Sequence, residues 1–339
     1  MGRINAIITG VAGYVPDYVL NNEELSRMVD TNDEWIVTRT GIKERRILTE
    51  EGLGTSYMAR KAAKLLMKKT GADPDSIDAL IVATTTPDYV HPSTASIVLG
   101  RLGLKNAFAF DFAAACCGFM YAFDVACNMV QSGRHKRVIV IGADKMSSIT
   151  DYQDRATCPL FGDGAGAVMV EGTEEESIGL MDSIHRTDGK GLPFLHVKAG
   201  GSVFPASHYS VDHRMHFTYQ EGRTVFRYAV TAMGDDCAEL LKRNNLTVDD
   251  VDYVVPHQAN LRIIEAVAKR IGVPMERVLV NIQRYGNTSA ACMPLVLWDF
   301  EKDLKKGDNL LFTAFGAGFV NGASYYRWAY DGSAMAGIK

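Results

Sequence analysis

The run Asp111-Phe-Ala-Ala-Ala-Cys116-Cys-Gly-Phe-Met120 joins a strand-like apolar stretch, residues 107–112, to a long amphipathic pattern that ends near Gly133. We therefore predict that Cys116 lies at a strand-to-helix junction. Unpaired backbone N–H groups and the helix dipole favour a thiolate there, and the small residues before Cys116 leave room for a substrate. A buried structural cysteine is the competing interpretation, because free cysteine is among the most buried residue types.

A second segment places a histidine at a similar junction. It reads Val254-Val-Pro-His257-Gln-Ala-Asn260-Leu-Arg262, an apolar strand followed by a helical pattern that starts after Asn260, a favourable N-cap residue. We expect His257 just beyond the carboxyl end of the strand, the edge at which α/β folds place their binding sites. A structural histidine remains an open interpretation of His257 alone.

A third segment, Tyr285-Gly-Asn287-Thr-Ser-Ala-Ala291, is a small-residue loop that follows a strand predicted over residues 278–282. An asparagine between Gly and Thr is more often a turn residue than a catalytic one. Neither His257 nor Asn287 establishes a site when it is taken singly.

Composition excludes several classes of protein. The chain has 339 residues with near-average apolar and charged content, enough for two core-forming units. A formal charge of -4 argues against a general nucleic-acid binder. No apolar run approaches the length of a membrane span, and the start lacks the apolar core of a signal peptide.

The cysteines, histidines and glycines give no sign of a metal or nucleotide cofactor. The six cysteines have neither a Cys-x-x-Cys pair nor metal-ligand spacing, and we expect reduced thiols in a cytoplasmic protein. The cluster His208, His213 and His216 is irregularly spaced in a polar loop. Glycine-rich stretches at residues 10–13 and 162–166 lack the dinucleotide fingerprint, so we assign them to tight turns and close backbone approach.

The sequence repeats itself at an offset of 174 residues. The repeat rests on four anchors. Three are pairs of residues: Asp78 with Asp252, Gly133 with Gly307, and Gly142 with Gly316. The fourth is a pair of helical stretches, Ala63-Lys-Leu-Leu and Ala238-Glu-Leu-Leu, displaced by one further residue. Strands and helices alternate in both parts, and the near-continuous apolar strands argue for largely parallel sheets covered by helices.

We therefore predict two similar α/β halves, residues 1–175 and 176–339, that pack as one rigid body. The offset carries Cys116 onto Ala290, three residues beyond Asn287. A pseudo-two-fold axis would bring the nucleophile and the asparagine together at the centre.

Cys116, His257 and Asn287 with their neighbours resemble the catalytic residues of thiolase-like condensing enzymes. The resemblance is strongest to the β-ketoacyl-acyl-carrier-protein synthase III family, which starts bacterial type II fatty acid synthesis. It covers nearly the whole chain and includes Asp33-Glu-Trp35-Ile-Val-Thr-Arg39-Thr-Gly-Ile42, Phe161-Gly-Asp-Gly-Ala-Gly166 and Phe315-Gly-Ala-Gly318. It implies a thiolase-like α/β fold in which the two duplicated halves pack as a five-layered αβαβα core.

The resemblance also implies a reaction: the decarboxylative Claisen condensation of an acyl-CoA primer with malonyl-acyl-carrier protein. Cys116 would carry the acyl group, and the backbone N–H groups of Cys116 and Ala317 would form the oxyanion hole. His257 and Asn287 would donate hydrogen bonds to the enolate that forms when the malonyl group loses CO₂. Each such donor is worth on the order of 3 kcal/mol. No cofactor is implied, since CoA and carrier protein belong to the substrates.

Binding residues follow from the same resemblance. The adenine of CoA is assigned to Trp35 and Arg39, an indole and a guanidinium four residues apart, with Arg155 nearby. Carrier protein is acidic, so a basic docking face is expected. From spacing alone, a solvated helix face explains the positive charges of Arg262, Lys269 and Arg270 equally well. The docking residues are Gln258, Ala259, Asn260, Leu261, Arg262, Arg227, Lys269 and Arg270.

The acyl pocket is assigned to His91, Phe226 and Phe315. Some relatives have Phe-Pro-Ser where this chain has His91-Pro-Ser, and that segment closes the pocket across the interface of a homodimer. Residues 189–216 form a longer and more aromatic stretch than usual, so the chain length and branching of the primer stay open.

Three alternatives are retained. A related Cys-His-Asn condensing enzyme of secondary metabolism would make a quinolone, polyketide or ketone precursor. A cysteine hydrolase would need a base that activates water, and no Asp or Glu motif supports one. A catalytically inactive binding scaffold has no need of Cys116, His257 and Asn287.

Overall fold

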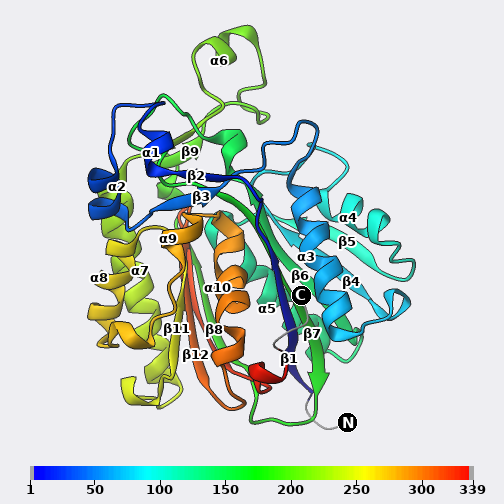
Figure 1. Cartoon of the computed structure of the whole chain (residues 1–339). Coiled ribbons are helices and arrows are strands. Elements are labelled where there is room, and N and C mark those ends of the chain that lie inside the picture. The colour runs from blue at the N-terminus through cyan, green and yellow to red at the C-terminus, as the bar shows by residue number, and fades with distance from the viewer. Residues whose placement is uncertain (1–3, 336–339) are drawn as a thin grey trace.

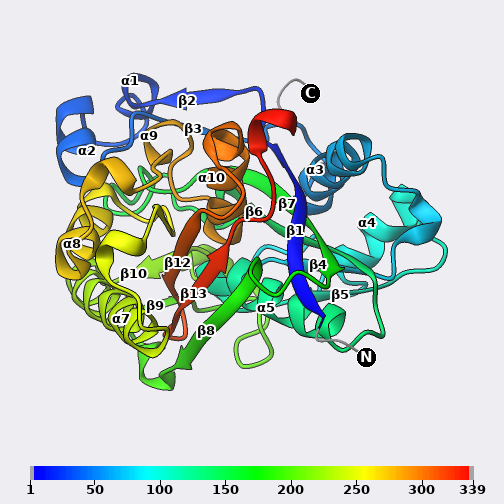
Figure 2. The ribbon, with the colours of Figure 1, turned by 90° about the horizontal axis from the view of Figure 1, so that it is seen from below.

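Two β-sheets form the centre of the molecule, and helices lie between and outside them (Figures 1 and 2). The structure is a computed structural model that describes residues 4–335. The first sheet has the order β1-β7-β6-β4-β5, with the bounds Asn5–Tyr14, Asp163–Thr173, Arg137–Lys145, Ala79–Ala83 and Phe108–Phe112. The second sheet has the order β11-β12-β13-β8, with the bounds Tyr253–Pro256, Asn309–Gly316, Val320–Arg327 and Gly179–Thr187.

Helices occupy three layers around these sheets. Between the sheets lie α5 (Gly118–Gln131) and α10 (Cys292–Phe300), which contact strands of both. The outer face of the first sheet is covered by α3 (Thr55–Thr70) and α4 (Thr94–Leu102), and that of the second by α7 (Gly222–Arg243) and α8 (Leu261–Ile271). This five-layered αβαβα arrangement confirms the predicted fold class.

Shorter elements frame one end of the molecule. The hairpin of β9 and β10 is joined by a long connection that carries α6 and projects from the body (Figure 1). The bounds of the shorter elements are Val19–Asn21 (β2), Asn22–Leu25 (α1), Asp33–Thr40 (α2), Glu44–Arg46 (β3), Leu195–Val197 (β9), His208–Asp212 (α6), Thr218–Gln220 (β10) and Ile282–Tyr285 (α9).

The helix predicted after Asn260 is α8. The Asn260 side chain accepts a hydrogen bond from the Arg262 N–H (2.9 Å), and Gly272 ends the helix at a φ of 81°. Side chains of α8 that face the sheet, such as Ile264 and Val267, are buried, and Arg262 on the other face is exposed. The apolar period and both caps therefore agree on one helix.

The sheets are mixed, so the prediction of largely parallel sheets is wrong. β4 runs parallel to β5 and β6, and β11 runs parallel to β12. The other neighbouring strands, β1 with β7, β6 with β7, β12 with β13 and β8 with β13, are antiparallel. Near-continuous apolar strands arise because helices cover both faces of each sheet, whatever the direction of neighbouring strands.

The two sheets repeat one topology, because β4, β6, β7 and β1 correspond in order and direction to β11, β12, β13 and β8. Each central helix also follows a 3₁₀ turn, Ala115–Cys117 before α5 and Ser289–Ala291 before α10. Both turns start with a non-glycine residue at positive φ, 45° for Ala115 and 53° for Ser289. At these turns the offset of 174 residues holds, and Cys116 corresponds to Ala290.

The offset changes along the chain. Val138 of β6 and Leu310 of β12 pair with the first residues of β4 and β11, and they lie 172 residues apart. The predicted match of Gly142 with Gly316 is therefore wrong by two residues, and Asp144 is the counterpart of Gly316. The division of the chain at residues 175 and 176 stays a prediction.

Residues 278–282 do not form the predicted strand. Val278 makes an isolated bridge with Val254, and the chain then enters α9. Val278 is buried because it packs into the cluster beneath α8, which explains its strand-like composition.

The glycine-rich stretches mark close packing and not turns. Gly166 lies within β7 and Gly162 directly before it, and Gly142, outside these stretches, lies in β6. A Cβ on Gly166 would lie 2.6 Å from Pro294, and one on Gly142 would lie 2.1 Å from the Ala290 carbonyl oxygen. The first sheet therefore touches the start of α10 through glycine.

We expect Gly142→Ala to lower the free energy of unfolding by about 3 kcal/mol, since the new methyl meets a backbone oxygen that cannot move aside. Gly100→Ala in α4 is the matched control, because a Cβ there meets nothing within 4 Å. It should raise that free energy by about 0.5–1 kcal/mol. Urea denaturation measures both. Equal values for the two variants would contradict the close contact.

Candidate active site

Cys116 lies in the 3₁₀ turn between β5 and α5, as the strand-to-helix junction predicts. Its side chain is partly exposed, and its Sγ lies 3.9 Å from the Ser289 hydroxyl of the equivalent turn. Cys117 differs, because it is fully buried and its thiol donates to the Val320 carbonyl (3.3 Å). Of the two neighbouring cysteines, Cys116 is the one that a substrate can reach.

His257 follows β11 directly, and its backbone N–H donates to the Thr313 carbonyl of β12 (2.8 Å). The imidazole is almost fully buried, and within residues 4–335 neither ring nitrogen has a hydrogen-bond partner. Burial lowers the pKa of His257 to about 3, so the ring is neutral at physiological pH. A neutral ring with an unpartnered nitrogen can donate to a substrate oxygen.

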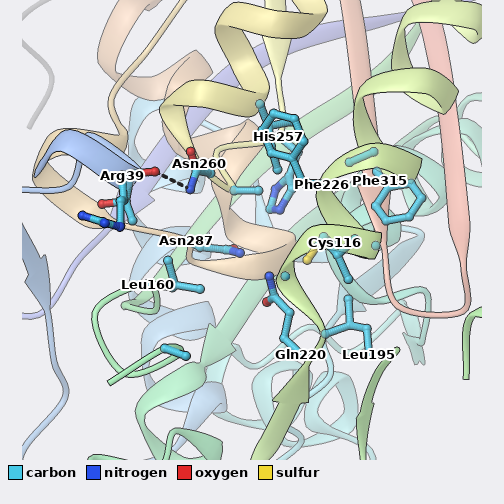
Figure 3. A pocket seen from close by; sticks show the side chains of 18 of the residues that line it. Arg39, Cys116, Leu160, Leu195, Gln220, Phe226, His257, Asn260, Asn287 and Phe315 are labelled. Carbon is cyan, nitrogen blue, oxygen red and sulfur yellow. Dashed lines mark hydrogen bonds between the residues drawn. The ribbon is translucent and has the colours of Figure 1, made fainter. Parts of the chain in front are cut away.

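Asn287 is held from both its backbone and its side chain. Its N–H donates to the Leu160 carbonyl (2.8 Å), and its own carbonyl accepts from the Gly162 N–H (3.1 Å). The side-chain Oδ1 accepts from the Ser289 N–H (2.8 Å). The amide oxygen is thus fixed, and the nitrogen end points towards Cys116 and His257 (Figure 3).

The turn between β12 and β13 lies against the nucleophile. A Cβ on Gly316 would lie 2.9 Å from the Cys116 backbone nitrogen, and Ala317 follows directly. Ala317 lines a cavity together with Cys116. This contact agrees with the predicted oxyanion hole, whose donors stay a prediction.

A cavity of about 210 Å³ connects the three predicted catalytic residues with the predicted CoA site (Figure 3). Trp35 and Arg39 line it together with Cys116, His257 and Asn287. The Arg155 guanidinium also lies close to the Trp35 indole.

The indole of Trp35 lies near two guanidinium groups. The Arg39 carbon Cζ is 4.7 Å from the ring centroid, and the Arg155 Cζ is 5.0 Å from it. Arg155 also pairs with the exposed Asp30 (3.2 Å). The structure therefore brings together all three residues of the predicted CoA site.

A second cavity, of about 270 Å³, adjoins the first at Cys116 and Asn287. Its walls are mainly apolar and include residues that sequence reasoning missed: Met146, Ile149, Phe161, Leu195 and Val197. Leu195 and Val197 belong to the short hairpin strand β9, which carries no local pattern of its own. The projecting connection with α6 does not line this cavity.

The predicted acyl-pocket residues fall in different places. Phe226 and Phe315 line the first cavity, on the side that also holds Trp35, and not the second. His91 is exposed on the loop before α4 and lines neither cavity of its own chain, so its assignment to a pocket closed across a homodimer interface stays a prediction.

Only part of the predicted docking segment faces solvent. Gln258 is fully buried and is bonded on both ends: its Nε2 donates to the Pro256 carbonyl (2.8 Å), and its Oε1 accepts from the Asn281 N–H (3.1 Å). The prediction that Gln258 binds a carrier is therefore wrong. Ala259 and Asn260 line the first cavity.

Leu261 is half-buried in the cluster that contains residues of α2. Arg262, Lys269 and Arg227 are exposed on α8 and α7. Arg270 is exposed as well, and its guanidinium pairs with Asp235 of α7 (2.5 Å). All four predicted basic residues therefore face solvent, and Arg270 shares its charge with an acidic neighbour.

Burial raises the pKa of Cys116 to about 12, although the Ser289 hydroxyl opposes that rise. Burial therefore acts against the thiolate, and the expected contribution of the helix N-terminus stays a prediction.

All six cysteines are free. In the part of the chain that the structure describes, no group of three or more His, Cys, Asp or Glu side chains could hold a metal ion. No helix within residues 4–335 is long and apolar enough to cross a membrane.

Comparison with known proteins identifies the family. Residues 110–189 match the model of 3-oxoacyl-[acyl-carrier-protein] synthase III, and residues 241–328 match the model of its C-terminal part. The chain is 70% identical over 333 residues to the beta-ketoacyl-[acyl-carrier-protein] synthase III of Phocaeicola vulgatus, covering 98% of this chain and 99% of that protein.

Solved structures agree. The crystal structure of 3-oxoacyl-[acyl-carrier-protein] synthase III from Aquifex aeolicus superimposes with a TM-score of 0.87 at 43% identity, covering 95% of this chain and 100% of that one. The priming β-ketosynthase of the R1128 polyketide pathway has a TM-score of 0.89 at 33% identity, covering 97% and 98%. The chain belongs to the β-ketoacyl-[acyl-carrier-protein] synthase III family of acyl-transferring condensing enzymes.

Proposed function

We propose that this protein condenses an acyl-CoA primer with malonyl-acyl-carrier protein to give a 3-oxoacyl-acyl-carrier protein, the first step of type II fatty acid synthesis. One observation carries the proposal: a reachable thiol, a neutral unpartnered imidazole and an oriented amide face one cavity. The same cavity reaches the indole and guanidinium groups that suit a CoA adenine.

In the first half-reaction, the Cys116 sulfur bonds to the thioester carbon of acyl-CoA. The carbon–sulfur bond to CoA breaks, and the proton of the Cys116 thiol ends on the released CoA sulfur. The N–H groups of Cys116 and Ala317 stabilise the tetrahedral oxyanion, because Gly316 has no side chain that would cover the Cys116 N–H.

In the second half-reaction, the malonyl carboxylate leaves as CO₂, and its bonding electrons form an enolate on the thioester. His257 and Asn287 donate hydrogen bonds to the enolate oxygen. Neither group is charged, so neither holds back the departing carboxylate. The enolate carbon then attacks the acyl carbonyl, the bond to Cys116 breaks, and the sulfur takes up a proton.

Substrate recognition uses two surfaces. The adenine of CoA stacks on Trp35 beside Arg39 and Arg155, as cation–π geometry allows. Carrier protein docks on the exposed basic residues Arg262, Lys269 and Arg227. Arg262 lies two residues beyond Asn260, and Arg227 follows Phe226; both Asn260 and Phe226 line the first cavity.

We also propose a cytoplasmic homodimer. The outer edge of β5 has no paired strand within residues 4–335, and Phe108 on it is 48% exposed. A second copy can pair with this edge and cover it. The loop with His91 and the exposed Tyr89 would then close the second cavity of the partner. Six free thiols suit a reducing compartment.

The acyl group enters the second cavity, since its apolar walls adjoin the Cys116 sulfur. A related condensing enzyme of secondary metabolism is the alternative, and the R1128 ketosynthase shares the fold at 33% identity. The higher identity to proteins named synthase III, 70% over nearly the full chain, favours the fatty acid pathway.

We expect the alkylation rate of Cys116 by iodoacetamide to rise about tenfold per pH unit from pH 7 to 9, because only the thiolate reacts and its pKa is raised to about 12. Intact-mass spectrometry of quenched samples measures the rate. Cys116→Ser should remove the reaction, and Cys117→Ser should leave it intact. A plateau below pH 8 would show a thiolate stabilised at rest.

His257→Ala and Asn287→Ala should still form the acyl-enzyme but lose malonyl decarboxylation by about 10²–10³-fold each, because one enolate donor is removed. Mass spectrometry follows acylation, and CO₂ release follows decarboxylation. Loss of acylation with decarboxylation preserved would reverse the two roles. Because the pKa of His257 is about 3, wild-type decarboxylation should show no acid limb between pH 6 and 8.

Arg262→Glu should raise the KM for malonyl-acyl-carrier protein about tenfold and leave acylation by acyl-CoA unchanged, since an acidic partner loses an attractive charge and meets a repulsive one. Added salt should weaken the wild type more than the variant.

Lys105→Glu is the matched control for this docking test. It makes the same charge change in the exposed loop between α4 and β5, on the opposite side of the molecule from α8 (Figure 1). Equal KM changes for both variants would show a net-charge effect and rule out α8 as the docking face.

A further inference from the structure

Asp144 is a fully buried carboxylate near the end of β6 that the reaction described above does not use. Its Oδ1 accepts hydrogen bonds from the loop that follows β4: from the N–H groups of Thr85 (2.7 Å) and Thr86 (3.1 Å), and from the hydroxyls of Thr84, Thr85 and Thr86. Its Oδ2 accepts from the Ala290 N–H (3.0 Å).

These donors identify the side chain as an acceptor on both oxygens. Backbone N–H groups can only donate, and they approach from Thr85, Thr86 and Ala290. Burial raises the pKa of Asp144, while the hydrogen bonds from the Thr85 and Ala290 N–H groups oppose that rise. Two oxygens that each receive N–H donors fit a carboxylate better than a carboxylic acid.

The internal duplication gives this contact a meaning. Ala290 corresponds to Cys116 at the offset of the turns, and Asp144 corresponds to Gly316 at the offset of the strands. In each half, the strand residue lies against the turn of the other half. Asp144 bonds to the Ala290 N–H, and Gly316 lies beside the Cys116 nitrogen.

The Cys116 N–H and the Ala290 N–H are equivalent by the duplication, but different groups lie next to them. At the catalytic turn, Gly316 has no side chain, so the Cys116 N–H stays open to the reacting carbonyl oxygen. At the second turn, the Asp144 carboxylate binds the Ala290 N–H permanently. Asp144 is an internal anion at the place that corresponds to the oxyanion hole.

The second turn carries the backbone N–H that orients the Asn287 side chain. Ser289 has a φ of 53°, a left-handed conformation that costs a non-glycine residue about 1–2 kcal/mol. Its N–H donates to the Asn287 Oδ1 (2.8 Å), and the next N–H along the chain is that of Ala290. Anchoring Ala290 therefore holds Ser289 where it fixes the amide of Asn287.

We propose that Asp144 is a positioning residue for malonyl decarboxylation: it fixes the Ser289–Ala290 turn through the Ala290 N–H and thereby keeps the Asn287 nitrogen aimed at the enolate. This inference rests on the proposed function, since it assigns Asp144 to malonyl decarboxylation. The charge of Asp144 also contributes to the raised pKa of the Cys116 thiol, so acylation is measured beside decarboxylation.

Asp144→Asn in the full-length protein tests the proposal. The two N–H groups and three hydroxyls on the Oδ1 side keep the asparagine oxygen there, so its NH₂ group faces the Ala290 N–H and two donors oppose each other. We expect decarboxylation of malonyl-acyl-carrier protein to fall at least about tenfold in kcat, with KM unchanged. Acylation of Cys116 should not fall, because loss of the Asp144 charge removes one cause of the raised pKa of the Cys116 thiol.

Thr84→Val is the matched control. It removes one hydroxyl from the Oδ1 side, at a buried residue that lines neither cavity, and leaves the Ala290 contact intact. Decarboxylation should stay within about threefold of the wild-type rate. An equal loss in both variants would show a general packing effect and overturn the proposal, as would unchanged decarboxylation in Asp144→Asn.

A double-mutant cycle separates positioning from structural damage. If Asp144 acts through Asn287, Asp144→Asn should cause no further loss of decarboxylation in the Asn287→Ala background. An additive loss would overturn the proposal. Should Asn287→Ala alone retain full decarboxylation, the proposed role of Asn287 fails instead, so the two failures are distinguishable.

Discussion

Contact between two copies of the same turn is the constraint on which the centre of this molecule depends. The 3₁₀ turns Ala115–Cys117 and Ser289–Ala291 touch each other, and each also lies against a glycine of the opposite half. Gly142 meets the Ala290 carbonyl, and Gly316 meets the Cys116 nitrogen. Because the glycines permit this approach, the nucleophile of one half and the asparagine of the other face one cavity. A side chain at either glycine would separate them.

Burial at this centre favours the uncharged form of His257, Cys116 and Asp144 alike. It keeps His257 neutral, raises the pKa of the Cys116 thiol and raises the pKa of Asp144. A dry cavity of neutral groups suits a reaction in which an anion forms on the substrate, because preorganised donors act most strongly away from water. The Asp144 carboxylate nearby is surrounded by donors of its own, so it does not compete with the substrate for His257 or Asn287.

Local patterns in the sequence were sufficient for the elements that carry the chemistry. Cys116 follows an apolar strand, Asn260 caps a helix, and these signals depend on neighbours along the chain. Features set by distant contacts were not predictable in this way. Gln258 looks like a solvent-facing loop residue, yet it is bonded to the chain around Asn281. The direction of neighbouring strands likewise depends on contacts between residues far apart in the sequence. So do the walls of the second cavity, which include residues of β9.

The duplication explains why only one of two equivalent turns is catalytic. Both turns have the same backbone, with a positive φ at Ala115 and Ser289, so geometry alone would allow an anion at either amide. The turns differ in the central residue, Cys116 or Ala290, and in the strand residue beside it: Gly316 leaves the Cys116 N–H open, and Asp144 binds the Ala290 N–H. The bound N–H cannot receive a reacting oxygen, but it is a fixed point from which Ser289 orients Asn287. These two differences make one copy the nucleophile and the other its support.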